Sequence, residues 1–172
     1  VNHIGDQAIA AINTDGTVKA DDVIMKADSA SDMFSLAGAV HIKTGNQNTG
    51  LGIAGTYSGT ELTGTADAYL KGVTLTAASL DMDALRHGSL LTIAAGVDGT
   101  FTKAGVAIAG SVTLNGIINH TEAYLDGVTA TLTGGVDLFA HDTSSLSAIA
   151  GGISLGGKGG IEGFEIRVLG DW

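Results

Sequence analysis

The sequence predicts an all-β fold, a right-handed parallel β-solenoid (β-helix) built from about three repeat units of about 55 residues. Three observations lead to this prediction: a long internal repeat, an alternation of apolar and polar residues with a period of two, and a composition rich in small residues. The chain has 172 residues, of which 27 are glycine and none is proline. Hydrophobic residues make up 44% but aromatic residues only 5%, so the core must consist mainly of Ala, Val, Ile and Leu.

The repeat is clearest in two seven-residue segments. Ala68–Thr74 reads Ala-Tyr-Leu-Lys-Gly-Val-Thr, and Ala123–Thr129 reads Ala-Tyr-Leu-Asp-Gly-Val-Thr, 55 residues further on. Weaker matches extend to the start of the chain. We therefore expect one domain, 1–172, to be a solenoid segment of a larger protein, since it begins at Val1 without a recognisable signal peptide. The repeat units lie near residues 7–64, 65–119 and 120–163.

Apolar residues alternate with polar ones inside each unit, which is typical of half-buried strands. Val73, Leu75 and Ala77, for example, alternate with Thr74 and Thr76. Because a slip of one residue would turn every side chain to the other face, matching positions should keep the same face in every unit. The further residues expected to face the interior are Val23/Met25/Ala27, Leu80/Met82/Ala84 and Val136/Leu138/Ala140, followed by Leu36/Gly38/Val40, Ile93/Ala95/Val97 and Ile149/Gly151/Ile153.

The spacing of these segments gives expectations about the coils. The segments around Ala68, Leu75 and Met82 lie seven residues apart, which predicts tight corners, and 98–105 is expected to form a longer loop. Each unit is expected to hold two or three coils. With about 18–27 residues per coil and about 4.8 Å between coils, six to nine coils would form a rod of about 30–45 Å. An antiparallel sandwich is the main alternative, but repetition of whole strand sets favours stacked coils.

Residues 164–172 depart from the repeat. Alternation restarts there with Phe164, Ile166 and Val168, so we expect a final strand that joins the last coil through a bulge or corner and protects its edge. The N-terminal edge at Val1–Ile4 has no comparable feature.

Composition argues against several classes of function. Cysteine is absent, which excludes disulfides and thiolate metal sites. The net charge of −10 disfavours nucleic-acid binding. No apolar run reaches the roughly 18 residues of a membrane helix. The glycine-rich stretch Gly151–Gly163 lacks the Gly-Lys-Ser/Thr of a phosphate-binding loop.

Candidate chemical sites are few. A metal site from His141, Asp142 and Asp137 is conceivable but has no recognisable motif, so we expect no catalytic, cofactor-binding or metal-binding residues and no cofactor. Tyr69 and Tyr124 are the candidate surface contacts. They could form a stacking ladder for a glycan or partner, or they could simply cover neighbouring threonine side chains.

The repeated phrases resemble those of the leukotoxin-type filamentous adhesins, which are large secreted repeat proteins of anaerobic Gram-negative bacteria. The resemblance covers roughly residues 1–163, although Ala11 stands where later units have Tyr69 and Tyr124. The phrases of that family correspond to Ala123–Val128, Val136–Ala140, Ile149–Gly152 and Gly157–Ile161.

The resemblance implies a secreted β-helical rod at the bacterial outer surface that serves attachment and virulence and has no catalytic residues. Its partners would be host or bacterial cell-surface proteins or glycans, bound through the parent protein. We therefore expect a structural stalk segment of an adhesin rather than an enzyme. The alternative is a carbohydrate-binding or polysaccharide-degrading β-helix.

Overall fold

The computed structural model describes residues 1–45, 49–103, 105–156 and 161–171, the last range by its backbone alone. This part of the chain is almost entirely strand, as the sequence predicts. The strands are β1 (Asn2–Asn13), β2 (Thr17–Lys19), β3 (Asp22–Thr44), β4 (Gly50–Lys71), β5 (Thr74–Ala77), β6 (Ser79–Phe101), β7 (Gly105–Asp126), β8 (Thr129–Leu132), β9 (Val136–Leu155) and β10 (Ile161–Asp171).

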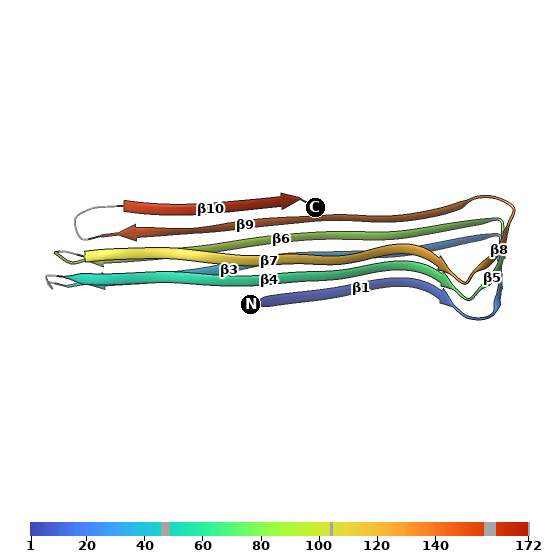
Figure 1. The fold of residues 1–172 in the computed structure, drawn as a ribbon, viewed down its shortest axis with the longest axis horizontal. Helices are drawn as coiled ribbons and strands as arrows, with labels where there is room; N and C mark the ends of the chain where they lie inside the picture. The colour runs from blue at the N-terminus through green and yellow to red at the C-terminus, as the bar shows by residue number, and fades with distance from the viewer. Residues whose placement is uncertain (46–48, 104, 157–160, 172) are drawn as a thin grey trace.

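The strands form three sheets through which the chain passes in turn. Sheet A has the order β1-β4-β7, sheet B has β2-β5-β8, and sheet C has β3-β6-β9 with β10 added beyond β9. All neighbours within the coils are parallel. Figure 1 shows the two long sheets A and C lying along each other, with the short strands of sheet B at one end. We call that end the corner end and the opposite one the loop end. The predicted parallel solenoid is confirmed.

Each repeat unit forms one coil, so the expectation of two or three coils per unit is wrong. Val23 of β3 pairs with Leu80 of β6, which in turn pairs with Val136 of β9. The physical reason is that β3 and β6 each run for 23 residues without a break. Three coils span only about 10–15 Å along the stacking axis, whereas the long strands extend for about 75 Å across it. The predicted rod of stacked small coils is therefore replaced by a wide, flat solenoid.

The corners lie where the seven-residue spacing predicts them, between β4, β5 and β6. Gly72 and Gly127 occupy equivalent corner positions with φ of 69° and 61°, a region in which L side chains are strained. The loop expected at 98–105 is much shorter than predicted, because β6 continues to Phe101 and β7 begins at Gly105.

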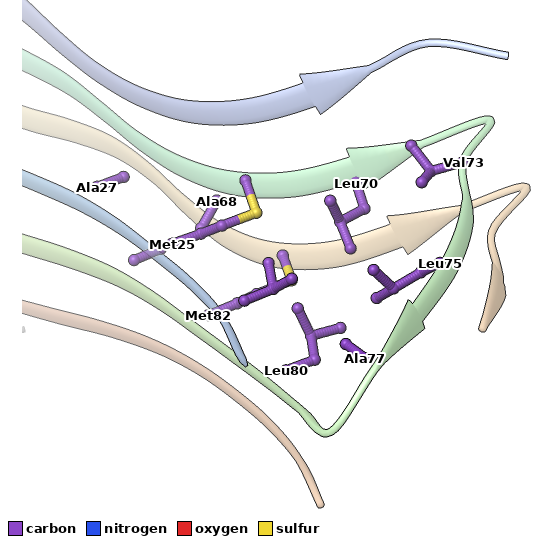
Figure 2. Close-up of a cluster of buried hydrophobic side chains, with 11 residues drawn as sticks. Met25, Ala27, Ala68, Leu70, Val73, Leu75, Ala77, Leu80 and Met82 are labelled. Atoms are coloured by element: carbon purple, nitrogen blue, oxygen red, sulfur yellow. The ribbon is translucent and has the colours of Figure 1, made fainter. Parts of the chain in front are cut away.

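The main hydrophobic core fills the triangular space where the three sheets meet at the corner end, as Figure 2 shows. Met82, Leu80 and Leu75 from the middle coil are 0–1% exposed, which confirms their predicted inward direction. Leu138 pairs with Met82 but is 37% exposed. Within the described residues no coil is stacked on the far side of its row at the corner.

The predicted facing is wrong in the loop half of sheet C. Leu36 and Val40 are 68% and 71% exposed. Ala94 and Gly96 face inward instead. The residues predicted inward and found on the outer face are Leu36/Gly38/Val40, Ile93/Ala95/Val97 and Ile149/Gly151/Ile153.

Two features account for this reversal, the unbroken run of β6 and the close approach of the two long sheets. Because β6 is continuous, the inward parity of Leu80 and Met82 persists to its end. A Cβ built on Gly96 would lie 2.9 Å from the carbonyl oxygen of Gly110 on the opposite sheet. Larger side chains do not fit between the sheets here, so they lie outside.

The chain ends in a strand, as predicted, but this strand reverses direction. β10 pairs antiparallel with β9, from Ile161 opposite Leu155 to Asp171 opposite Ser145. It therefore extends sheet C instead of turning a corner into sheet A. Trp172 and residues 157–160, which include part of the glycine-rich phrase, lie outside the described residues. The protective role of the tail stays a prediction.

Candidate functional site

The two candidate surface tyrosines lie side by side on the outer face of sheet A at the corner end. Tyr69 pairs with Tyr124, and Ala11 occupies the same row in the first coil, as the repeat predicts. The two rings stack with centroids 5.1 Å apart and planes 11° apart. Since each tyrosine covers one ring face of the other, less aromatic surface is available to a sugar than two separate rings would offer. Their role as contacts stays a prediction.

Ion pairs surround the stacked rings and complete what we call the tyrosine patch. The nitrogen of Lys71 lies 2.8 Å from a carboxylate oxygen of Asp126, and Nε2 of His120 lies 3.3 Å from Glu122. The hydrogen bond to Asp126 and its charge raise the pKa of Lys71. The patch consists of Asp67, Tyr69, Lys71, His120, Glu122, Tyr124 and Asp126.

The carboxylate of Asp67 has the longest polar contact in the patch. Its side chain is 16% exposed, and its Oδ1 lies 4.0 Å from Nε2 of His120. Burial raises the pKa of this carboxyl, Glu122 raises it further, and His120 opposes the shift. The patch is thus a surface of polar contacts and stacked rings that a partner can contact.

A second polar feature, which the sequence reasoning missed, lies between the sheets. Arg86 is 0% exposed. Its Nη1 donates to the carbonyl oxygens of His87 at 2.8 Å and Ser29 at 3.3 Å, and to Oγ of Ser29 at 3.2 Å. Nη1 also donates to Oδ2 of Asp6 at 3.3 Å, and Nη2 lies 3.2 Å from Oδ1 as an ion pair. A buried guanidinium is therefore held by a carboxylate from another coil.

The register of the strands positions these groups. Ser29, Arg86 and Asp142 form one inward row of sheet C, and Asp6, Gly64 and Asn119 form the row opposite in sheet A. Gly64 leaves the space that the guanidinium fills, because a Cβ there would lie 2.0 Å from Nε of Arg86.

The polar contacts continue into the third coil. Arg86 Nε donates to Oδ1 of Asn119 at 3.4 Å, and Nδ2 of Asn119 donates to Asp142 at 2.8 Å and Ser144 at 2.7 Å. We call Asp6, Ser29, Arg86, Asn119, Asp142 and Ser144 the polar chain. It crosses all three coils and forms cross-links between them.

The electrostatics of the polar chain favour its charged form. Burial opposes ionisation of Asp6, but hydrogen bonds from Ser29 and Ser31 and the charge of Arg86 outweigh burial and hold the pKa of Asp6 below its usual value. A signal for Arg86 was present in the sequence, because continuing the parity of Met82 and Ala84 by two residues places Arg86 inside.

A related arrangement occurs at the loop end. Asp98 is fully buried, accepts a hydrogen bond from Oγ1 of Thr100 at 3.3 Å and lies 3.5 Å from Nδ1 of His41. A Cβ built on Gly52 would lie 2.2 Å from its Oδ1. As with Gly64 and Arg86, a glycine of sheet A makes room for a buried polar side chain of sheet C.

The conceivable metal ligands are not brought together. His141 packs beside the ring of Phe139, whereas Asp142, the next residue, faces inward to Asn119. Neighbouring residues of a strand point to opposite faces, which separates the two. Within the described residues no three His, Asp or Glu side chains are close enough to hold a metal ion.

A cavity of about 460 Å³ opens at the end of the third coil. Its lining includes Asn115, Asn119, Asp142, Ser144 and Leu146, which are inward positions of β7 and β9. The cavity is thus the uncovered interior of the last coil, continuous with the polar chain.

Within the described residues there is no helix of the length and hydropathy that crossing a membrane requires. Comparisons with protein-family models, curated proteins and solved structures found no match.

Proposed function

We propose that this chain is a structural rod or stalk segment of a secreted bacterial surface adhesin, which holds a binding region away from the cell and does no catalysis. The observation that carries the proposal is the in-register stacking of equivalent residues from coil to coil. One example is the stacking of Tyr69 on Tyr124. Another is the single row formed by Met25, Met82 and Leu138. Further coils with the same residues at equivalent positions could stack on this one in the same way.

The hydrogen-bond pattern suits a load-bearing role. All 22 residues of β4 pair with β7, and β6 pairs with β9 over the whole length of β9. These backbone hydrogen bonds point along the stacking axis, so a force along that axis loads two long ladders at once. The ion pair of Arg86 with Asp6 adds a buried link between the first two coils.

The adhesin part of the proposal is supported by the resemblance of the repeated phrases, such as Ala123–Val128, to those of filamentous adhesins. Attachment would then reside in other parts of the parent protein, with a cell-surface protein or glycan as its partner.

A force measurement tests the structural role. The chain is placed between two marker domains and extended in an optical trap. We expect cooperative steps that release one coil, about 55 residues or roughly 180–200 Å of contour length. A continuous extension without steps would contradict the stalk role.

Two assays test the other parts of the proposal. Antibodies against this chain should label intact cells of the source organism, and labelling only after lysis would exclude a surface location. The same protein should neither bind a glycan array nor cleave polysaccharides. Binding that is lost in Tyr124→Ala but kept in the matched outward variant Thr129→Ala would favour the carbohydrate-binding alternative.

A further inference from the structure

The loop half of sheet A has an outer face that is apolar and uncharged. At the outward positions of β4 from Leu51 to Gly59, and of β7 from Val106 to Leu114, there is no charged side chain, whereas Glu61, opposite Gly116, borders the face next to Ile118. Eight large side chains on this face are 53–64% exposed: Leu51, Ile53, Tyr57, Val106, Ile108, Val112, Leu114 and Ile118.

A groove of about 700 Å³ runs beside the glycines of this face, and Ala150 and Gly151 of β9 in sheet C complete its lining. Its floor contains Gly55 and Gly110, which pair across β4 and β7. A Cβ on Gly110 would meet no atom within 4 Å, and one on Gly55 would meet only the carbonyl oxygen of Gly110 at 3.8 Å. The space above the two glycines is therefore open.

Aliphatic and aromatic side chains form the walls of this groove. Ile53 and Ile108 stand on one side, and Tyr57 and Val112 stand on the other. On sheet C the equivalent row contains Ala95, whose methyl group interrupts the glycine floor. In sheet A the corresponding row is glycine in both β4 and β7.

We propose that this apolar face of sheet A packs against the same face of a second copy of the chain. The eight side chains, at about 100 Å² each, expose roughly 800 Å², which is what one partner contributes to a standard protein interface. This area exceeds the largest apolar patch of a typical monomer, roughly 300–600 Å². The face is therefore large enough to form a stable dimer.

The shape of the face is self-complementary. Ridges and groove alternate at two-residue intervals along the strands, about 6.6–6.8 Å apart. A copy related by a two-fold axis can place its Ile108 ridge above Gly110 of the first copy and receive the equivalent ridge in return. Glu61, with His3 at 3.6 Å, lies at the border of the area of contact, and the outward charges of Asp67 and Lys71 lie further into the corner half.

Sedimentation velocity of the full chain over a range of concentrations tests the proposal. We expect a reversible dimer, and we expect Ile108→Lys to weaken it at least about tenfold because it buries an unpaired charge. Gly110→Val should weaken it similarly by filling the groove, with no loss of thermal stability since its Cβ meets no neighbour. The matched control is Leu36→Lys, an equally exposed position on sheet C, which should leave the dimer unchanged.

Three results would overturn the proposal. The first is a wild-type chain that stays monomeric at about 100 μM. The second is equal weakening by Leu36→Lys and Ile108→Lys. The third is a monomer that floats with phosphatidylcholine–phosphatidylglycerol vesicles and loses this binding in Ile108→Lys, which would assign the face to lipid. If Ile108→Lys does not fold, Gly110→Val decides between dimer and monomer.

Discussion

The fit between Gly64 and Arg86 allows a sharp test of the polar chain by the substitution Gly64→Ala. The added methyl carbon would lie 2.0 Å from Nε, 2.3 Å from Cζ and 2.4 Å from Nη2 of Arg86. These distances are far below van der Waals contact. The guanidinium must therefore leave its position, and its hydrogen bonds to Ser29 and His87 and its ion pair with Asp6 break.

The expected cost follows from the burial of the two charges. Separating a buried ion pair typically costs about 3–5 kcal/mol. Arg86 is fully buried but the side chain of Asp6 is 27% exposed, so water partly replaces its lost partner. We therefore expect about 3 kcal/mol, which corresponds to a fall in Tm of about 6–12 °C for a chain of this length.

Urea and thermal unfolding followed by far-ultraviolet circular dichroism measure this cost. Gly116→Ala is the matched control, because a Cβ there meets no atom within 4 Å, and it should be neutral or stabilising by up to about 1 kcal/mol. In an Arg86→Ala background, Gly64→Ala should cost less than about 0.5 kcal/mol. An equal cost of Gly64→Ala with and without Arg86 would refute the reasoning.

Three further predictions concern the core, the tyrosine patch and the tail. Met82→Ala should cost about 2–5 kcal/mol in urea unfolding, and Leu138→Ala clearly less because its row is open at the end of the stack; equal costs would contradict this. Because the folded-state pKa of Asp67 is raised, stability should fall as pH rises from its unfolded pKa of about 3.9 through the folded pKa. Asp67→Asn should therefore stabilise the protein at pH 7 but not below about pH 4, and a gain that is independent of pH would argue against this. Deletion of residues 161–172 should lower solubility and Tm by uncovering the edge of β9, and an equally stable, monodisperse product would exclude a protective role.

The facing of the loop half follows from the parity of Leu80 and Met82 only if β6 runs unbroken, and the sequence pattern alone does not establish that continuity. Leu36 and Val40 read as inward residues because apolar side chains are usually buried, yet the distance between sheets A and C decides the matter. That distance depends on Gly96 meeting the backbone of Gly110 across the interior. A local pattern contains no information about a residue on the opposite sheet.

The sequence by itself determined the all-β class, the parallel stacking, the corners and the register. Period-two alternation and repeated phrases can be recognised in the amino-acid sequence itself. Tyr69 and Tyr124, for example, occupy equivalent positions of the sequence repeat and also pair in the folded structure. The tertiary structure decided the number of coils and the pairing of Arg86 with Asp6, because both depend on where long strands lie opposite one another. Gly64 and Arg86 come from different sheets, so the space that Gly64 leaves for Arg86 forms only when sheets A and C pack against each other.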